Sequence, residues 1–177
     1  MLKKILGFVI LLAVGIVAYA AMQPPQYQLS REMLINATPE VLFPYINNSK
    51  KANDWMPWKD SDPQMKMEFS GPDEGVGSTS SWDSQGQMGT GKAEVVESIP
   101  NKSVKTKLTY TRPMSMSQLA EISLTPVDSG TKVRWEVRGE NALLCRVVCL
   151  FMDMDKMIGG EFEKGLSKLK VQVEAGR

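Results

Sequence analysis

Hydrophobic and polar positions follow three patterns in succession along the chain. Residues 5–22 form an apolar run without a charged residue, which predicts a helix just long enough to cross the hydrocarbon core of a membrane. Between residues 27 and 137 apolar and polar residues mostly alternate, which is typical of strands with one face in water. Closer to the C-terminus apolar residues recur three or four apart, which indicates an amphipathic helix.

The first strand is predicted over residues 27–35, where the alternation is regular. Thr38-Pro39-Glu40 then indicates the start of a helix, because Thr38 can cap it and proline suits the first helical position. Pro44 limits this helix to about two turns. A second short helix is predicted over residues 49–55.

Six further strands are predicted downstream from alternation and from the turn residues between the segments. They cover residues 65–69, 78–83, 87–99, 104–110, 119–127 and 133–137. In the last of them Trp135 lies on the apolar face, and we expect Arg134, Glu136 and Arg138 to face water.

The C-terminal region is predicted to form one long helix with a continuous apolar stripe. The residues of the stripe are Val147, Phe151, Met154, Ile158, Phe162, Leu166, Leu169 and Val173. Gly159-Gly160 is the place where such a helix can bend. The order of elements predicts an α+β domain, in which one face of an antiparallel meander packs on the helix, and strong curvature of the sheet would open a cavity between them.

The apolar run is preceded by Lys3 and Lys4, and no further basic residue occurs before Arg31. By the positive-inside rule, residues 1–4 stay in the cytoplasm and the rest of the chain is exported, to the periplasm in a Gram-negative cell. Residues 5–22 would then anchor the protein in the cell membrane as a single pass.

A cleaved signal peptide is the alternative, because Ala18-Tyr19-Ala20 fits a cleavage pattern. Both interpretations place the remaining domain, residues 27–174, outside the cytoplasm. Residues 23–26 include Pro24-Pro25 and are expected to form a short stiff linker.

Composition narrows the range of functions. The formal net charge is +1, and without Lys3 and Lys4 it is near −1 (19 basic against 20 acidic residues), which argues against nucleic-acid binding. The absence of histidine removes the commonest general base and metal ligand, and the two cysteines cannot form a metal site alone. We expect no metal and no cofactor. The twelve methionines suit an adaptable apolar surface, although ordinary core filling explains any one of them.

Several motifs resemble one known group of proteins over residues 27–173. They are Ile35-Asn36-Ala37-Thr38-Pro39-Glu40-Val41, Trp55-Met56-Pro57-Trp58, Gly71-Pro72 with Gly75-Val76-Gly77-Ser78, Thr131-Lys132-Val133-Arg134-Trp135-Glu136 and Phe162-Glu163-Lys164-Gly165-Leu166-Ser167-Lys168-Leu169-Lys170. In order and spacing they resemble the START / Bet v 1-like (SRPBCC) superfamily, in particular its polyketide cyclase / dehydrase and lipid transport branch. The resemblance implies a helix-grip fold, with a curved sheet of about seven strands wrapped on the C-terminal helix and an apolar cavity between them. It implies no particular activity.

The predicted cavity wall combines inward strand positions with the helix stripe. The candidate ligand-binding residues are Phe43, Trp55, Phe69, Trp82, Met88, Tyr110, Trp135, Phe151, Met154, Ile158 and Phe162. The alternative is that these side chains fill a solid core. Residues 143–152, with Arg146 as their one polar residue, are expected to be buried on several sides, and contact with lipid or with a partner is the alternative.

The function that fits best is membrane-anchored binding or transport of a hydrophobic small molecule or lipid by a monomer. No two acidic residues are spaced so as to demand a shared site, so no catalytic residue is assigned. A cyclase- or dehydratase-type enzyme is one alternative, and it would place a carboxylate or Tyr110 with a perturbed pKa in the cavity. An envelope protein-interaction or stress module is the other, and it would show a filled core and an exposed apolar patch.

Overall fold

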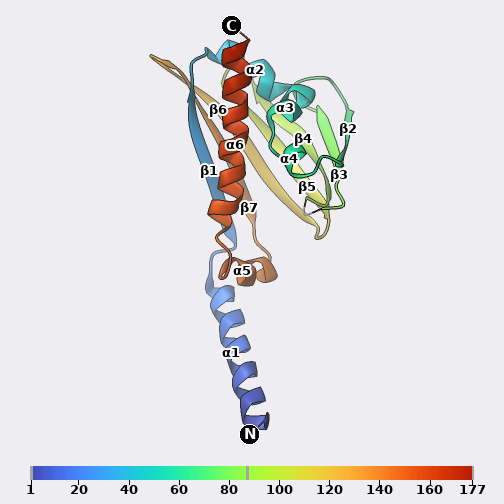
Figure 1. Cartoon of the computed structure of the whole chain (residues 1–177), viewed down its shortest axis with the longest axis vertical. Helices are drawn as coiled ribbons and strands as arrows, with labels where there is room; N and C mark the ends of the chain where they lie inside the picture. Colours follow the sequence, from blue (N-terminus) through green and yellow to red (C-terminus); the bar gives the residue numbers. More distant parts are fainter. Residues whose placement is uncertain (1, 87, 177) are drawn as a thin grey trace.

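An antiparallel sheet of seven strands forms the framework of the structure (Figure 1). The computed structural model describes residues 2–86 and 88–176, apart from the side chains of Leu2 and Met154. The strand order is β1-β7-β6-β5-β4-β3-β2, so the strands from β2 to β7 form a meander and the first strand joins the last. The strands are β1 (Gln26–Ile35), β2 (Lys66–Ser70), β3 (Thr79–Asp83), β4 (Thr90–Ile99), β5 (Ser103–Arg112), β6 (Met116–Val127) and β7 (Gly130–Glu140).

The C-terminal helix lies across the concave face of this sheet, and short helices cover the rest of that face (Figure 1). The helices are α1 (Leu2–Met22), α2 (Pro39–Asn47), α3 (Ser49–Trp55), α4 (Trp58–Ser61), α5 (Leu143–Cys149) and α6 (Met154–Ala175). α6 packs mainly against β1, and it also contacts β7, α2 and α3. The α+β fold predicted from the sequence, with an antiparallel sheet gripping a C-terminal helix, is confirmed.

Helix α1 projects away from the domain (Figure 1). Its segment Lys3–Met22 is long and apolar enough to cross a membrane, and nearly all of it is exposed. A helix that packed into a soluble core would be mostly buried, so the exposure of these apolar side chains sets α1 apart from α6.

Helix α2 begins where the sequence predicts, although its N-terminus is stabilised differently. Pro39 occupies the first turn, but the Thr38 side chain makes no capping hydrogen bond to the backbone. The Thr38 hydroxyl is instead bonded to Glu40, which lowers the pKa of that carboxyl. Pro44 lies inside the helix, which ends at Asn47, in agreement with the expected two turns.

The prediction of one continuous C-terminal helix was wrong. α5 ends at Cys149, and α6 begins after Asp153, whose carboxylate accepts a hydrogen bond of 3.1 Å from the backbone N–H of Lys156. This aspartate caps a new helix, although the apolar spacing continues across the break. α6 then runs without a break through Gly159 and Gly160.

The expectation that residues 143–152 are buried on several sides was also wrong. Leu144 and Phe151 are exposed, as are other apolar side chains of this segment. The break before Asp153 separates α5 from α6, so α5 lies against α1 and not under the sheet (Figure 1).

Close aromatic packing holds α6 on β7. The ring of Trp135 on β7 stacks on Phe162 of α6, with centroids 4.0 Å apart and planes inclined by 1°. A Cβ atom at Gly165 would lie 2.8 Å from the Trp135 ring and 3.1 Å from the Pro57 ring. The absence of a side chain at Gly165 therefore lets the Trp135 and Pro57 rings approach the helix backbone. Trp55 is fully buried beside them, edge-on to Trp135 at 5.4 Å.

A second contact fastens the N-terminal turns of α6 to β1. The Arg31 guanidinium donates to Asp155 and Glu163, with the shortest N–O distance 2.8 Å in both pairs. These hydrogen bonds raise the pKa of Arg31 further. A Cβ atom at residue 159 would collide with the guanidinium. The glycine at this position therefore leaves the space that Arg31 occupies over the helix.

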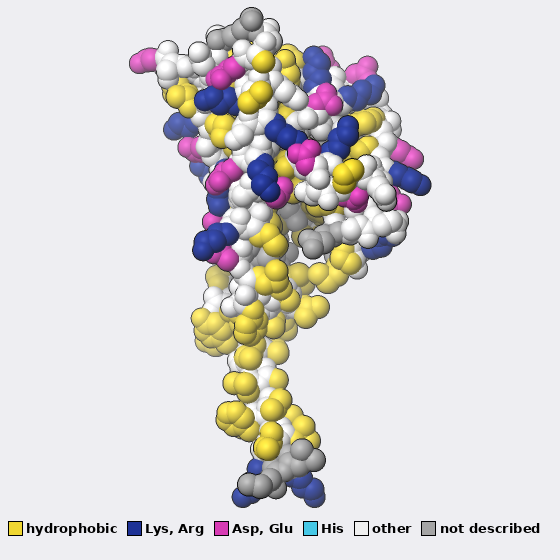
Figure 2. Space-filling model, viewed as in Figure 1, with side chains coloured by type: hydrophobic (Ala, Val, Ile, Leu, Met, Phe, Trp, Pro, Cys, Tyr) yellow, Lys and Arg dark blue, Asp and Glu magenta, His cyan; other side chains and the backbone are white. Residues whose placement is uncertain are grey.

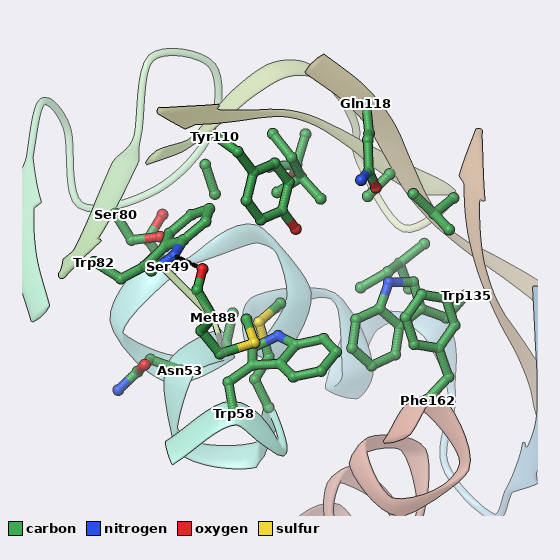
Figure 3. A pocket seen from close by; sticks show the side chains of 18 of the residues that line it. Ser49, Asn53, Trp58, Ser80, Trp82, Met88, Tyr110, Gln118, Trp135 and Phe162 are labelled. Carbon is green, nitrogen blue, oxygen red and sulfur yellow. Dashed lines mark hydrogen bonds between the residues drawn. The ribbon is translucent and has the colours of Figure 1, made fainter. Parts of the chain in front are cut away.

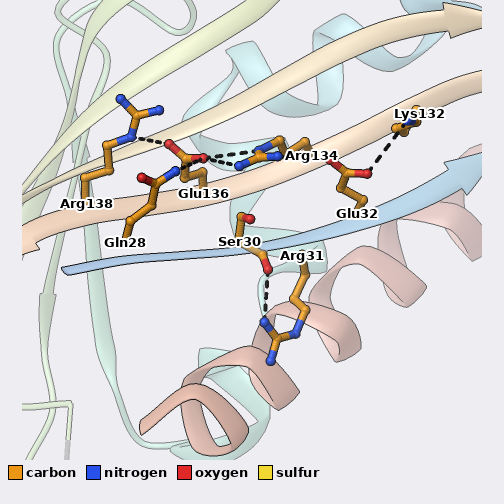
Figure 4. Close-up of polar contacts among 8 residues, drawn as sticks. All are labelled: Gln28, Ser30, Arg31, Glu32, Lys132, Arg134, Glu136 and Arg138. Carbon is orange, nitrogen blue, oxygen red and sulfur yellow. Dashed lines mark hydrogen bonds and ion pairs between the residues drawn. The ribbon is translucent and has the colours of Figure 1, made fainter.

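The outer face of β7 carries a clamped carboxylate (Figure 4). Glu136 was expected to face water, but it is only 4% exposed, because Arg134 and Arg138 close over it from either side. Gln28 on β1 donates to the same carboxylate at 2.8 Å. Burial raises the pKa of Glu136, but the hydrogen bonds from both arginines and from Gln28 outweigh it and leave that pKa below its ordinary value.

We expect Gly165→Ala to destabilise the protein and Gly160→Ala to stabilise it. The new methyl group at residue 165 would meet Trp135, and such overpacking costs about 1–3 kcal/mol, more than the gain in helix propensity. At residue 160 nothing lies within 4 Å of the new atom, so the same substitution gains about 0.5–1 kcal/mol. Thermal unfolding of the two variants in the same detergent measures both shifts, and equal shifts would contradict this account of Gly165.

We expect Glu136→Gln to lower the melting temperature at pH 7 and to lose part of that effect in acid. A carboxyl whose folded pKa is depressed stabilises the fold above its ordinary pKa of 4.5, and this stabilisation disappears as the pH falls through the folded value. Melting curves at pH 7 and pH 3 should therefore show a gap between wild type and variant that is narrower at pH 3. Glu68→Gln, at an exposed carboxylate on β2, is the control and should show little gap at either pH.

Candidate functional site

A cavity of about 400 Å³ lies between the concave face of the sheet and helices α3, α4 and α6. Its size falls within the roughly 300–1,000 Å³ typical of small-molecule sites. Strands β2 to β7 contribute to the wall because their alternate side chains point inward. Small and aliphatic residues make up much of that surface: Ile46, Ala52, Ala93, Val95, Val104, Leu108, Pro113, Ala120, Ile122, Val137 and Ile158.

Aromatic side chains stand on opposite sides of the cavity (Figure 3). Trp82 on β3 meets Tyr110 on β5 edge to face, with centroids 5.3 Å apart, and its indole N–H donates to the carbonyl of Met88 at 3.2 Å. On the other side Trp135 lies between Phe162 and Trp58, whose centroid is 6.4 Å from its own. Fixed aromatic rings provide large apolar contact surfaces for a ligand.

A glycine sets the position of Trp82. Gly91 on β4 pairs with Trp82, and a Cβ atom there would lie 2.5 Å from the indole ring. The register of β4 shifts next to this glycine, between Thr90 and Gly91. The bulge and the missing side chain together allow the indole to lie against the neighbouring strand.

Methionines form an adaptable part of the wall. Six of the twelve methionines of the chain line the cavity: Met56, Met65, Met67, Met88, Met114 and Met116. Their unbranched side chains can change shape at little cost, so this part of the wall can adjust to ligands of different outline.

The polar groups of the wall are few and uncharged. They are Ser49, Asn53, Ser80, Thr106, Tyr110 and Gln118. Figure 3 shows the Tyr110 and Gln118 side chains directed into the cavity from the sheet. Among the described residues, no Asp, Glu, Lys or Arg lines the cavity, and Tyr110 is its one titratable side chain. Burial raises the pKa of Tyr110, so its phenol stays protonated at neutral pH and can donate a hydrogen bond.

The comparison with protein families assigns the domain. A family model described as polyketide cyclase / dehydrase and lipid transport matches residues 26–174, which include the whole sheet, the cavity and α6. The chain belongs to this family. The resemblance noted in the sequence is thereby confirmed, and it covers all of the chain except α1, the linker and the last three residues.

Several solved structures share the fold of this domain, although their sequence identity to it is low. Protein MLL2253 from Mesorhizobium loti is 19% identical, with a TM-score of 0.60, over 84% of this chain and 97% of that one. The Aha1 dimer from Colwellia psychrerythraea is 21% identical, also with a TM-score of 0.60, over 85% and 98%. The di-domain ARO/CYC StfQ from the steffimycin biosynthetic pathway is 10% identical, with a TM-score of 0.59, over 86% and 52%. Among curated protein sequences, none shows significant similarity to this chain.

The structure brings part of the predicted ligand-binding set together. Trp82, Met88, Tyr110, Trp135, Ile158 and Phe162 all line the cavity. They come from three strands, the turn before β4 and the N-terminal half of α6.

The other predicted wall residues lie elsewhere. Phe43 packs against the core from α2, and the buried Trp55 donates its indole N–H to the carbonyl of Tyr45 at 3.0 Å, so both form a layer behind the wall. Phe69 lies on the edge strand β2, partly exposed, and Phe151 is exposed in the turn after α5. The side chain of Met154 lies outside the described residues.

Some wall residues were missed by the sequence interpretation. Trp58 lines the cavity, whereas Trp55, three residues earlier in the same motif, is fully buried behind the wall. Met67 also lines the cavity, and the alternation of β2 places it on the inward face together with Phe69. Gln118 could not be predicted from the alternation, because a polar residue in a strand is expected on the outward face, and this glutamine points inward.

The two cysteines do not contribute to this site. Cys145 and Cys149 are free, half-buried thiols of α5. Within residues 2–86 and 88–176, no group of three or more His, Cys, Asp or Glu side chains is arranged to hold a metal ion.

Proposed function

We propose that this chain is a membrane-anchored protein that binds or transports an uncharged hydrophobic small molecule or lipid in its internal cavity. The observation that carries the proposal is the composition of the cavity wall, in which the described residues are apolar and aromatic with neutral polar groups only. The description of the family, which includes lipid transport, supports the same class of ligand.

The absence of charge from the described wall selects neutral ligands. An ionised group moved from water into such a cavity loses its hydration and finds no counter-ion, which costs several kcal/mol or more. A hydroxyl or carbonyl group can instead be satisfied by neutral donors and acceptors. Tyr110 and Gln118 both project into the cavity and can serve that purpose (Figure 3).

The N-terminal helix supplies the proposed anchor. α1 is apolar over its whole length beyond Lys3 and Lys4, and those lysines would remain on the cytoplasmic side. The domain would then lie outside the cytoplasm. Three residues, 23–25, separate α1 from β1 and reach at most about 10 Å, so the cavity would stay close to the bilayer surface.

A cyclase- or dehydratase-type reaction is the second candidate, and Tyr110 is the observation that favours it. A buried phenol that stays protonated can donate a hydrogen bond to a ligand carbonyl and polarise it. The family description includes cyclases and dehydrases, and StfQ is described as an ARO/CYC protein. Product formation from a bound polyketide-like substrate, lost in Tyr110→Phe, would support this candidate.

The first test is native mass spectrometry of the full chain released from detergent micelles, with extraction of any co-purified molecule. We expect an adduct of one neutral, apolar molecule per chain. A chain that carries no adduct, and that takes up nothing from a panel of neutral lipids, would contradict the binding proposal.

We expect Ala93→Phe to abolish or strongly weaken this binding. Ala93 on β4 points into the cavity, and a phenyl ring there would occupy ligand space, so the affinity should fall about tenfold or more. Lys92→Phe places the same ring on the opposite face of the same strand and is the matched control. Equal ligand occupancy in the two variants would show that the ligand binds elsewhere.

We also expect a long-chain alcohol to bind more tightly than the carboxylate of the same chain length, by about tenfold or more at neutral pH. Tyr110→Phe should weaken binding of the alcohol by about 2- to 10-fold, since it removes one neutral hydrogen bond, and leave a pure alkane unaffected. Competition against a fluorescent apolar probe measures all three ligands. Preference for the carboxylate would contradict the neutral-ligand proposal.

A further inference from the structure

Apolar side chains gather at the base of the domain, beside the end of α1 (Figure 2). We call residues 143–152 the basal patch; they comprise α5 and the turn after it, and Arg146 is their one charged residue. Leu144 is 63% exposed and Phe151 72%. Further exposed apolar residues of the patch are Leu143, Val148, Leu150 and Met152.

The basal patch is held firmly against α1. The Arg146 guanidinium donates to the backbone carbonyls of Ala21 at 3.2 Å and of Gln23 at 2.9 Å. A cation at this position also suits the negative end of the helix. Ala20, in the last turn of α1, is fully buried, and the backbone N–H of Asn141 donates to the carbonyl of Pro25 at 2.8 Å. The linker is therefore pinned on both sides, and the patch has a fixed place relative to α1.

Continuity with α1 indicates what covers this surface. Figure 2 shows Lys, Arg, Asp and Glu side chains scattered over the upper part of the domain, whereas hydrophobic side chains predominate at its base and along α1 as far as the lysines near its end. If α1 spans a bilayer, the basal patch lies at the level where the span ends. Apolar helices at that level enter the interface to a depth of about 5–10 Å.

We propose that the basal patch is a second membrane contact, which inserts into the outer interface of the bilayer beside α1 and fixes the orientation of the domain. This rests on the proposed anchoring by α1 and adds the direction in which the cavity faces. Figure 1 shows the turn between β5 and β6 at the end of the domain nearest α5. Pro113 and Met114 of this turn line the cavity, and Met114 is exposed. The base of the cavity is then held at the lipid surface, from which an apolar ligand can enter.

The test places nitroxide labels on the full chain reconstituted in phosphatidylcholine nanodiscs. Cys145→Ser and Cys149→Ser give a cysteine-free background, and Leu144→Cys and Phe151→Cys add one label site each. Oxygen concentrates in the bilayer, so frequent collisions between oxygen and a label indicate contact with lipid. A water-soluble nickel chelate stays in the solvent, so collisions with it indicate exposure to water. We expect both labels to collide severalfold more with oxygen, relative to the nickel chelate, than a label on the far end of the domain.

Two control sites make the result interpretable. Val171→Cys lies on the exposed side of α6, and Val171 is 67% exposed, which matches Leu144 and Phe151 in exposure and apolar character. Val9→Cys lies in α1 and reports on the anchor itself. Each variant must first melt at the same temperature as the cysteine-free background. If the variant at residue 144 or 151 does not, the label at the other of these two residues is used.

The outcomes separate the two proposals. Lipid contact at residues 9, 144 and 151, with solvent contact at residue 171, supports the second membrane contact. Lipid contact at residue 9 with solvent contact at 144 and 151 overturns it and leaves the anchor intact. Shielding of 144 and 151 from both reagents also overturns it, because a protein partner or a second copy would then cover the patch. Solvent contact at residue 9 would overturn the anchor itself.

Discussion

The grip of the sheet on α6 is the contact on which the rest of the structure depends. Gly165 lets Trp135 and Pro57 meet the helix backbone, and Phe162 stacks on Trp135. α6 covers only the end of the sheet formed by β1 and β7, and its most extensive contact is with β1. The remaining strands have no long helix to bury their concave face. They face α3 and α4 instead, and the space that these short helices leave unfilled is the cavity.

The sequence predicted the fold well where local rules and tertiary packing agree. Alternation located the strands, and turn residues separated them, because a strand with one wet face shows its period directly. The helix break before Asp153 was missed because the apolar spacing runs across it, although Asp153 itself is a capping residue that could have indicated it. Glu136 shows the opposite failure. Its position in the alternation correctly placed it on the outer face, but its burial depends on two neighbouring arginines that close over it.

The sequence predicted which face of a strand or helix points inward, but not which residues on that face line the cavity. Met67 and Phe69 share one face of β2, yet only Met67 reaches the cavity, because β2 is the edge strand and Phe69 is partly exposed there. Trp55 and Trp58 differ for a similar reason. Both are apolar and close in sequence, but the turn at Pro57 sends one into the core and the other into the wall. Alternation and helical period report direction, whereas depth in the molecule depends on how far the sheet curves, which no local pattern encodes.

The proposed anchor changes what the cavity must achieve. If α1 is a membrane helix, the domain, tied to it by three residues, would meet bilayer components at an effective concentration in about the millimolar range, far above that of a freely diffusing carrier. Tight binding is then unnecessary for loading, and release back to the membrane requires that binding be moderate. A wall in which flexible methionines stand beside fixed tryptophans fits this requirement, since it provides apolar contact without a rigid match to one shape. Under the same proposal the neutral lining would supply selectivity through the cost of burying charge, so the cavity would discriminate between ligands by excluding charged ones.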